Sequence, residues 1–445
     1  MEPSKNSSKM YYKEQSELLT SLLNHTFERG LKEGLMNFDK VEYYITTDCN
    51  LNCRYCYLRR YGDELYPRRL RKAEKIVENS KILTNWLKER DFAGKLEIFS
   101  GEPTILPYFF DILDYVLENL PKTKVVIPTN MTFLFDDDLT AQIEERLKTR
   151  RVFLSASIDG RYLQNLNRPF KCNRPYDDAF YDKAFAFAAK WGFGFHPMVY
   201  SSGIELWQKN FLWFMEMHEK YNLPKESLYL LEVRNEEWNE RQIYELYKFM
   251  RFLVRYVWEE IAKRDSKAFF DFIFEKRGFN ILSSPFSICG RGIGCSIQST
   301  LTVRLGDLAI VPCHRLSYEP LIAGKFIVRK GRIVGVKARN PEVLVSILSA
   351  TTRDFPVCES CILKYLCSSG CLGAQFEATG NMFAPIPTVC MVEHWKILGI
   401  ILELKELGLL EDMMSRIAPE KRASIRLLLE VYEDARNRAI KRAAE

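Results

Sequence analysis

The sequence predicts an α/β fold, because apolar segments with strand character alternate with segments of helical periodicity. The helical pattern is found over 69–88, 108–120 and 139–149. Such alternation builds a parallel sheet from βαβ units, and six units fit a partial, TIM-like (β/α)6 barrel. The expected strands are 41–47, 95–100, 124–129, 152–158, 193–200 and 228–234.

The rest of the chain divides by its texture. Residues 1–38 predict a helical lead-in to the barrel, which we expect over 39–235. Residues 236–284 predict a helical connector whose many aromatic side chains are interpreted as packing rather than recognition. The segment 285–395 contains loops, short strands and most of the cysteines, and 396–445 returns to helix with a charged tail. We therefore expect a barrel, then a small cysteine-rich domain, then C-terminal helices.

The composition is ordinary for a globular protein, with 445 residues of which 47% are hydrophobic and 27% charged. The net charge of +6 would suit an acidic substrate, but no basic run or basic helix predicts nucleic-acid binding. No apolar stretch reaches membrane-spanning length, and the polar residues after Met1 predict no signal peptide. We therefore expect a cytoplasmic protein without a membrane partner, in which twelve clustered cysteines indicate metal binding rather than disulfides.

Three cysteines directly follow the first expected strand. Cys49, Cys53 and Cys56 have the spacing Cys-x3-Cys-x2-Cys. Thiolates are the natural ligands of iron–sulfur clusters, and three of them can hold a cubane whose fourth iron stays open to a substrate or cosubstrate. Structural zinc is the alternative, but zinc normally takes four ligands from paired knuckles, and no Cys or His follows within the next hundred residues.

This loop resembles the cluster loop of radical S-adenosylmethionine (SAM) enzymes, and the resemblance extends over about residues 40–395. It implies a [4Fe-4S] cluster whose open iron is chelated by SAM. In that family the reduced cluster cleaves SAM to a 5′-deoxyadenosyl radical, which takes a hydrogen atom from the substrate. It also implies an electron donor such as flavodoxin or ferredoxin.

Eight further cysteines resemble the SPASM extension of these enzymes, which implies two auxiliary [4Fe-4S] clusters and three clusters in all. By position, the first would be held by Cys289, Cys295, Cys313 and Cys371, and the second by Cys358, Cys361, Cys367 and Cys390. Two zinc ions are the alternative for these eight thiols. The turn from Gly306 to Cys313 is longer than is usual in the family, which predicts a longer hairpin.

Motifs at the ends of the next strands resemble the SAM pocket of the family. Ser100-Gly101-Glu102-Pro103 resembles Gly-Gly-Glu-Pro, which implies that Glu102 accepts a hydrogen bond from the methionyl ammonium of SAM. Gly101 would let the backbone approach closely. The residues that the resemblance assigns to SAM are Tyr55, Ser100, Gly101, Glu102, Asn130, Ser157 and Arg168.

Several of these assignments have a structural alternative. Asn130, in a motif that resembles Thr-Asn-Gly-Thr, either bonds near the sugar or forms a turn. Ser157 would bind the ribose hydroxyls. Arg168 would face the SAM carboxylate, or form a surface ion pair. Tyr55 would lie on the adenine, or pack the loop. Residues 196–198 on the fifth strand face either adenine or core, with backbone contacts favoured.

Three residues are candidates for direct roles in catalysis. His314 follows Cys313, where the anaerobic sulfatase-maturating relatives have an aspartate that serves as base, and a surface histidine is the alternative. This difference counts against formylglycine formation. Cys172 lies in the loop after the fourth strand and is either catalytic or a small buried hydrophobe. Glu232, near the end of the sixth strand, would reach the substrate.

The resemblance implies a peptide or protein substrate, because relatives with two auxiliary clusters mostly oxidise, crosslink or decarboxylate peptides. About 40 residues precede the first strand, so we expect no fused peptide-binding winged helix and allow for a separate peptide-recognition protein. We predict a SAM-dependent radical oxidase or crosslinking enzyme. One alternative is modification of a small cofactor precursor, which needs a closed pocket instead of an open groove. Another is a non-catalytic iron–sulfur electron carrier, which would not need the motif at 100–103.

Overall fold

The computed structural model describes residues 5–33, 38–234, 236–287, 295–351, 354–367 and 370–444. Its strands are β1 (Lys40–Tyr44), β2 (Lys95–Phe99), β3 (Lys124–Thr129), β4 (Val152–Ala156), β5 (Met198–Val199), β6 (Leu231–Glu232), β7 (Thr300–Arg304), β8 (Ala309–Val311), β9 (Gly324–Arg329) and β10 (Arg332–Ala338). Eight of them form one sheet in the order β10-β9-β8-β7-β1-β2-β3-β4, and β5 pairs with β6. The pairs from β7 through β1, β2 and β3 to β4 are parallel.

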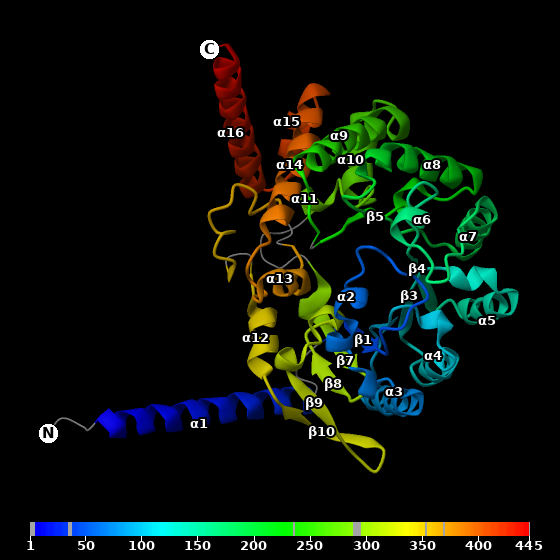
Figure 1. Cartoon of the computed structure of the whole chain (residues 1–445), viewed down its shortest axis with the longest axis vertical. Helices are drawn as coiled ribbons and strands as arrows, with labels where there is room; N and C mark the ends of the chain where they lie inside the picture. The colour runs from blue at the N-terminus through cyan, green and yellow to red at the C-terminus, as the bar shows by residue number, and fades with distance from the viewer. Residues whose placement is uncertain are drawn as a thin grey trace.

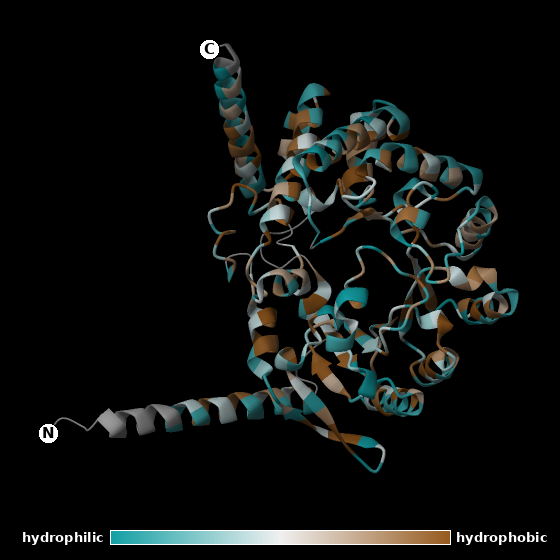
Figure 2. Ribbon diagram, viewed as in Figure 1, coloured by the Kyte–Doolittle hydropathy of each residue, from teal (hydrophilic) through white to brown (hydrophobic). Residues whose placement is uncertain are grey.

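Helices surround the parallel strands on their outer side. Figure 1 shows α3 (Ala73–Lys88), α4 (Phe109–Asn119), α5 (Asp137–Leu147), α7 (Asp178–Trp191) and α8 (Trp207–Lys220) in an outer arc, while α2 (Tyr57–Leu65) lies within it. Hydrophobic and hydrophilic residues alternate along these helices in Figure 2, as expected where one face is buried. The remaining helices are α1 (Lys5–Lys32), α6 (Gln164–Asn167), α9 (Glu240–Tyr256), α10 (Ser266–Phe274), α11 (Ser284–Ser287), α12 (Pro341–Ser349), α13 (Leu372–Thr379), α14 (Pro387–Glu406), α15 (Leu410–Arg416) and α16 (Pro419–Ala444).

This arrangement confirms the predicted α/β class with a largely parallel sheet. The fifth and sixth strands are shorter than predicted, but single parallel bridges join Ala156 to Phe195 and Phe195 to Leu228. The strand order therefore continues from β4 toward β5 and β6. The unexpected feature is β7, which comes from the cysteine-rich segment and pairs in parallel with β1. It supplies hydrogen-bond partners to an edge of β1 that would otherwise be open.

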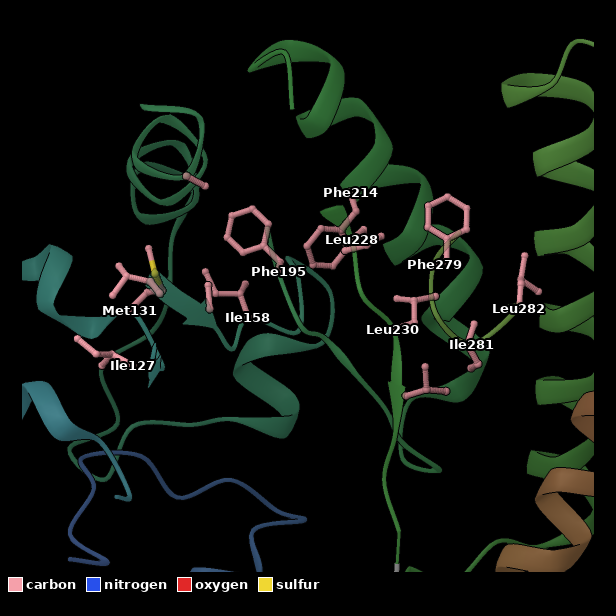
Figure 3. Close-up of a cluster of buried hydrophobic side chains, with 14 of the residues drawn as sticks. Ile127, Met131, Ile158, Phe195, Phe214, Leu228, Leu230, Phe279, Ile281 and Leu282 are labelled. Atoms are coloured by element: carbon pink, nitrogen blue, oxygen red, sulfur yellow. The ribbon is translucent and has the colours of Figure 1, made fainter. Parts of the chain in front are cut away.

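A continuous apolar layer separates the strands from the outer helices. Figure 3 shows it running from Ile127 on β3, past Phe195 and Leu228, to Phe279 and Leu282. All five side chains are nearly or fully buried. Close packing in this layer fixes the positions of the strands relative to the outer helices, and so the positions of the loops that follow the strands.

Both terminal helices extend away from the barrel in Figure 1. The C-terminal end of α1 is anchored, since Phe27 is buried and Glu28 accepts a 2.8 Å hydrogen bond from the backbone amide of Ala338 on β10. Within the described ranges, no helix has both the length and the apolarity that crossing a membrane requires.

A fully buried arginine joins the hairpin that begins with β7 to the rest of the barrel. The guanidinium of Arg304 donates to the backbone carbonyl of Leu65, at the end of α2, and to that of Ser317. It also lies 3.0 Å from Asp307 and 3.3 Å from Glu319. Three segments, the end of α2, the hairpin at 304–307 and residues 317–319, therefore depend on one charge that has no access to solvent.

Replacing Arg304 by Met should lower the free energy of unfolding by about 3 kcal/mol, because it leaves buried carbonyls and a carboxylate without their partner. Arg339→Met is the matched control, since Arg339 contacts the same Glu319 at 2.8 Å but is half exposed. Its loss should change the stability by about 0.5 kcal/mol. Urea unfolding of the cluster-loaded proteins measures both, and equal losses in the two variants would contradict this prediction.

Candidate cluster and cofactor site

The three cysteines that follow β1 lie at the carboxyl edge of the parallel strands. Cys49, Cys53 and Cys56 line a cavity of about 590 Å³ together with residues from the ends of β2, β3 and β4. In open parallel sheets this edge is where ligands bind, because the loops that follow several strands converge there. The residues that bring the other strand ends to the cavity are Ser100, Gly101, Thr129, Asn130 and Ser157.

Backbone hydrogen bonds hold the cysteine loop in place. The amide of Asn52 donates to the carbonyl of Pro169 at 2.7 Å, and the amide of Arg54 donates to that of Asn167 at 2.9 Å. Two backbone hydrogen bonds from the segment after β4 therefore hold the middle of the cysteine loop in place. The first half is tied down by Asn130, whose amide donates to the Asn50 side chain at 2.9 Å.

Gly101 allows the closest approach in this site. A Cβ atom at that position would lie 2.3 Å from the carbonyl oxygen of Asp48 and 2.6 Å from that of Thr47. Both oxygens belong to the backbone that leads into the cysteine loop. The space for a side chain is therefore already filled, which gives a physical reason for glycine in the Ser-Gly-Glu-Pro turn.

The donor set fits an iron–sulfur cluster. Burial raises the pKa of the Cys49 and Cys53 thiols to about 12, so their ionisation requires the positive charge of a bound metal. In the described part of the chain, no group of three or more His, Cys, Asp or Glu side chains could hold a single metal ion. The ligands of a [4Fe-4S] cluster need not converge on one ion, because each thiolate binds its own iron. The thiols need only surround a cavity.

Glu102 is fully buried and does not line this cavity. Its carboxylate accepts hydrogen bonds from the Thr104 hydroxyl at 2.6 Å, the Thr129 hydroxyl at 2.8 Å and the backbone amide of Asn130 at 2.6 Å. Burial raises its pKa, although these donors oppose the shift. In this geometry Glu102 ties the end of β3 to the turn after β2, and the predicted contact of its carboxylate with SAM stays a prediction.

Asn130 and Met131 form the turn that was one of the two expectations for this motif. The Asn130 side-chain oxygen accepts from the backbone amide of Thr132 at 3.0 Å and from its hydroxyl at 2.7 Å. Met131 has a φ of 63°, in the left-handed region that glycine adopts most easily, and it stands where the Thr-Asn-Gly-Thr motif that this segment resembles has its glycine. Asn130 still lines the cavity, so a contact with the sugar remains compatible with the turn.

A buried ion pair replaces the surface ion pair that was the alternative for Arg168. Its Nε lies 3.0 Å from Oδ1 of Asp159, whose side chain is fully buried. The Tyr55 hydroxyl donates to the same carboxylate at 2.6 Å, and the guanidinium lies 5.3 Å from the centre of the Tyr55 ring. Both Arg168 and Tyr55 line the cavity. Asp159 therefore orients two of the residues assigned to SAM.

The remaining SAM-pocket assignments divide between lining and support. Ser100 lines the cavity, and its buried hydroxyl has no hydrogen-bond partner within the described protein. Such a group is available to a ligand. Met198 also lines the cavity and donates its backbone amide to Asp159 at 2.9 Å. His196 instead lies 2.8 Å from the Ser155 hydroxyl and does not reach the cavity.

Four of the C-terminal cysteines surround a second, small cavity. It is lined by Cys358, Cys361, Cys367 and Cys390. Cys361 is also 3.9 Å from Nε2 of His394, and this contact lowers the pKa of its thiol. These four are the residues predicted to hold the second auxiliary cluster.

Cys371 lies between the two predicted auxiliary clusters. Burial raises the pKa of the Cys313 thiol well above its usual range, and the neighbouring thiols of Cys371 and Cys295 add to the shift. Cys371 also lines a cavity beside Cys358, Cys367 and Cys390. Cys289 lies outside the described residues, so the full ligand set of the first auxiliary cluster stays a prediction.

His314 is partly buried and does not line the main cavity. Its Nδ1 lies 2.8 Å from Oε1 of Glu42, and its ring stacks on Phe99 with centroids 3.9 Å apart. Glu42 is buried inside the barrel, directly opposite Glu97 in the β1–β2 register. Lys40 bridges the two carboxylates, at 2.6 Å from Glu97 and 3.8 Å from Glu42. His314 therefore belongs to a charged network, and its role as a base stays a prediction.

The other two catalytic candidates are also away from the cavity. The expectation that Cys172 is either catalytic or a buried hydrophobe is wrong in its second half, because the thiol is exposed on a loop. The adjacent Lys171, not Cys172, lines the cavity. Glu232 is buried against Lys396 of α14 in a close ion pair. The residue two positions later, Arg234, faces the cavity instead.

The cavity has a basic lining that was not predicted from the sequence. The described lining includes eight Arg or Lys side chains and only two acidic ones, Asp48 and Asp63. These cations come from five separate parts of the chain, and of the eight only Arg68 and Arg71 lie within a basic run, residues 68–72. The eight are Arg59, Arg60, Arg68, Arg71, Arg168, Lys171, Arg234 and Arg315.

Comparison with known proteins identifies the first part of the chain. Residues 43–174 match the Radical SAM superfamily, so the chain carries a radical SAM domain over this range. A segment of 134 residues is 26% identical to the uncharacterized protein MJ0907 of Methanocaldococcus jannaschii. That alignment covers 29% of this chain and 42% of the relative, so the chain matches less than half of that protein.

The fold resembles those of solved structures over a longer range. Native anSMEcpe with bound AdoMet has a TM-score of 0.56 at 17% identity, covering 83% of this chain and 98% of that chain. Native anSMEcpe with bound AdoMet and Cp18Cys peptide has a TM-score of 0.55 at 17% identity, covering 83% and 99%. At this identity the likeness concerns the fold, and it extends well beyond residue 174.

Gly101→Ala should displace the cysteine loop, because the new methyl group has no space between two backbone carbonyls. Overpacking of this kind costs about 1–3 kcal/mol. After anaerobic reconstitution, the variant should bind about four irons fewer than the wild type. Gly335→Ala on β10 is the matched control and should retain its iron, since nothing lies within 4 Å of the added carbon. Full iron content and unchanged SAM affinity in Gly101→Ala would contradict the close approach described here.

Proposed function

We propose that this chain is a radical SAM enzyme that abstracts a hydrogen atom from a peptide or protein, leading to oxidation or crosslinking of that substrate. The observation that carries the proposal is the shared cavity at the carboxyl edge of the sheet. Three thiols and the ends of four parallel strands meet there, and the strand-end residues Ser100, Gly101, Asn130 and Ser157 are among those that the SAM-pocket motifs assign. An electron carrier would have no use for this second set of residues.

In this proposal each part of the cavity has a separate task. Cys49, Cys53 and Cys56 would hold the cluster, and Ser100 and Ser157 would offer hydroxyls to SAM. Asp159 orients Arg168 for the SAM carboxylate, since an arginine matches a carboxylate with two parallel hydrogen bonds. When bound, the cluster and SAM supply the one-electron cleavage that starts radical chemistry. The protein contributes alignment and a cavity from which water is excluded.

The auxiliary cysteines would extend this site toward the C-terminal helices. Cys358, Cys361, Cys367 and Cys390 would hold one further cluster, and Cys295, Cys313 and Cys371 would hold another together with Cys289. Clusters at these positions would accept an electron from the substrate radical or bind the substrate directly. We further propose a flavodoxin or ferredoxin as the electron donor, with cytoplasmic residence and, as an added partner, a separate peptide-recognition protein.

A peptide substrate is supported by the size of the cavity and by one neighbour. The cavity of about 590 Å³ extends from the cysteine loop past α2 to Arg234 and Arg315, toward the cysteine-rich part of the chain. The neighbour of similar fold was solved with AdoMet and the Cp18Cys peptide. A small cofactor precursor is the second candidate, and it would require the same cavity to close around it.

Iron analysis tests the metal assignment. Anaerobically reconstituted protein should bind about twelve irons, from three cubanes. Replacing Cys49, Cys53 and Cys56 together by Ala should leave about eight irons, because only the radical SAM site is lost. Cys172→Ala is the matched control and should retain all of the iron, since this thiol is exposed and belongs to none of the three predicted ligand sets. Stoichiometric zinc with little iron would overturn the assignment.

SAM cleavage tests the enzyme assignment. With dithionite, wild-type protein should produce 5′-deoxyadenosine, and the triple cysteine variant should produce none because no cluster remains to bind SAM. Liquid chromatography of the quenched reaction measures the product. Retention of the two auxiliary clusters in the variant, seen by its remaining iron, excludes general unfolding as the cause. Wild-type turnover in that variant would refute the proposal. A wild-type protein that contains its clusters but produces no 5′-deoxyadenosine would favour the electron carrier.

A further inference from the structure

The wall of the cavity that faces the cysteine-rich segment carries an unusual set of arginines. Arg60 lies on α2, Arg234 follows β6, and Arg315 follows Cys313. Three segments that are far apart in the sequence therefore each place one guanidinium on the same cavity. The two acidic residues of the lining do not balance them, because Asp63 is occupied by Arg68 and Arg71, at 2.9 and 2.7 Å.

Each of these three arginines is held from behind by a carboxylate outside the lining. Arg60 lies 2.7 Å from Glu236, and Arg234 lies 2.6 Å from Glu393. The Nε of Arg315 donates to Glu377 at 2.8 Å, and its second edge nitrogen donates to the same carboxylate. The side chains of Glu393 and Glu377 are almost completely buried.

These contacts position each guanidinium, with Arg234 also 3.5 Å from Glu232, and they leave further N–H donors available. A guanidinium has five N–H groups in a rigid fork, and a carboxylate partner uses at most two of them in a bidentate pair. Arg315 is further restrained because its guanidinium lies 4.7 Å from the centre of the Tyr57 ring. Since the arginines are positioned before any ligand binds, little side-chain entropy would be lost on binding.

These arginines are separate from the one assigned to SAM. Arg168 is paired with Asp159 next to Tyr55, on the side formed by β4 and the segment that follows it. Arg234 instead lines the neighbouring cavity with Cys367 and Cys371. The set of Arg60, Arg234 and Arg315 therefore lies between the SAM side and the auxiliary cysteines, where a substrate would enter.

We propose that Arg60, Arg234 and Arg315 form a carboxylate-binding wall that selects peptides with an acidic group close to the reacting residue. The acidic group is an Asp or Glu side chain or the C-terminal carboxylate. Arginine is the residue best suited to such recognition, because its planar fork matches a carboxylate. This inference rests on the proposed function, and it adds the class of peptide that the enzyme accepts.

Peptide binding to the reconstituted holoenzyme, loaded with SAM, tests the proposal. The probes are four fluorescein-labelled peptides of Gly and Ser with one central Cys. One sequence carries Glu and the other carries Gln on both sides of the Cys, and each of the two is made as free acid and as C-terminal amide. Fluorescence anisotropy should show at least one acidic form binding about tenfold tighter than the Gln amide, which corresponds to about 1.4 kcal/mol. The comparison of acid with amide tells which source of the carboxylate is recognised.

The same titration with Arg60→Gln and Arg234→Gln should reduce the preference to about twofold or less. Arg241→Gln, which removes the same charge from the exposed surface of α9, is the matched control and should keep the preference. Iron content and the midpoint potentials of the clusters are measured on every variant. An unchanged preference in the Arg60 and Arg234 variants would overturn the proposal, and so would a shift in potentials or iron alone, because the arginines would then serve the clusters.

The wild-type protein separates this inference from the proposed function. A holoenzyme that cleaves SAM but binds acidic and amide peptides equally would overturn the acidic wall and leave the radical SAM assignment standing. A loaded protein that neither cleaves SAM nor binds any of the four peptides would overturn both. A preference that weakens as the salt concentration rises supports the wall, because the contacts are between charges.

Discussion

The carboxyl edge of the parallel strands is the constraint on which the rest of this structure depends. Strands β1 to β4 are in parallel register, so the loops after them must meet at one edge. The distance between these loops is set by Gly101, whose backbone lies against the carbonyls of Thr47 and Asp48. Glu102 and Asn130 then tie the second and third strand ends to the cysteine loop. A side chain at position 101 would separate the thiols from the pocket beside them.

Buried charged residues link the barrel to the cysteine-rich segment. Inside the barrel, Glu42 and Glu97 lie opposite each other, an arrangement that is unfavourable unless cations compensate it. Lys40 does so, and His314, which follows a cysteine predicted to bind a cluster, contacts Glu42 at 2.8 Å. On the other side, Lys396 of α14 contacts Glu232 of β6. Such pairs are weak sources of stability but strong constraints on position, because a lost partner leaves a buried charge.

The candidate site was predictable where chemistry is local in the sequence. The spacing of Cys49, Cys53 and Cys56 identifies a cluster loop in any fold, since three thiols within eight residues already form the ligand set. The contacts that individual side chains make were harder to predict. Glu102, Glu232 and His314 were expected to meet ligand or substrate; the structure shows each bonded to a protein partner, and their ligand contacts stay predictions. Sequence position gives the strand end on which a residue lies, but not the face toward which it points.

By itself, the sequence determined the alternation of strands and helices, the cysteine pattern and the strand-end motifs, because these depend on short-range periodicity and spacing. Only the tertiary structure decided that β7 extends the barrel sheet, since strand pairing across about 250 residues has no local signal. It also decided that Arg60, Arg234 and Arg315 share a cavity wall. Their partners, Glu236, Glu393 and Glu377, come from other segments in all three cases. The proposed preference for an acidic substrate therefore rests on packing between distant segments, because only packing brings these three arginines to one cavity.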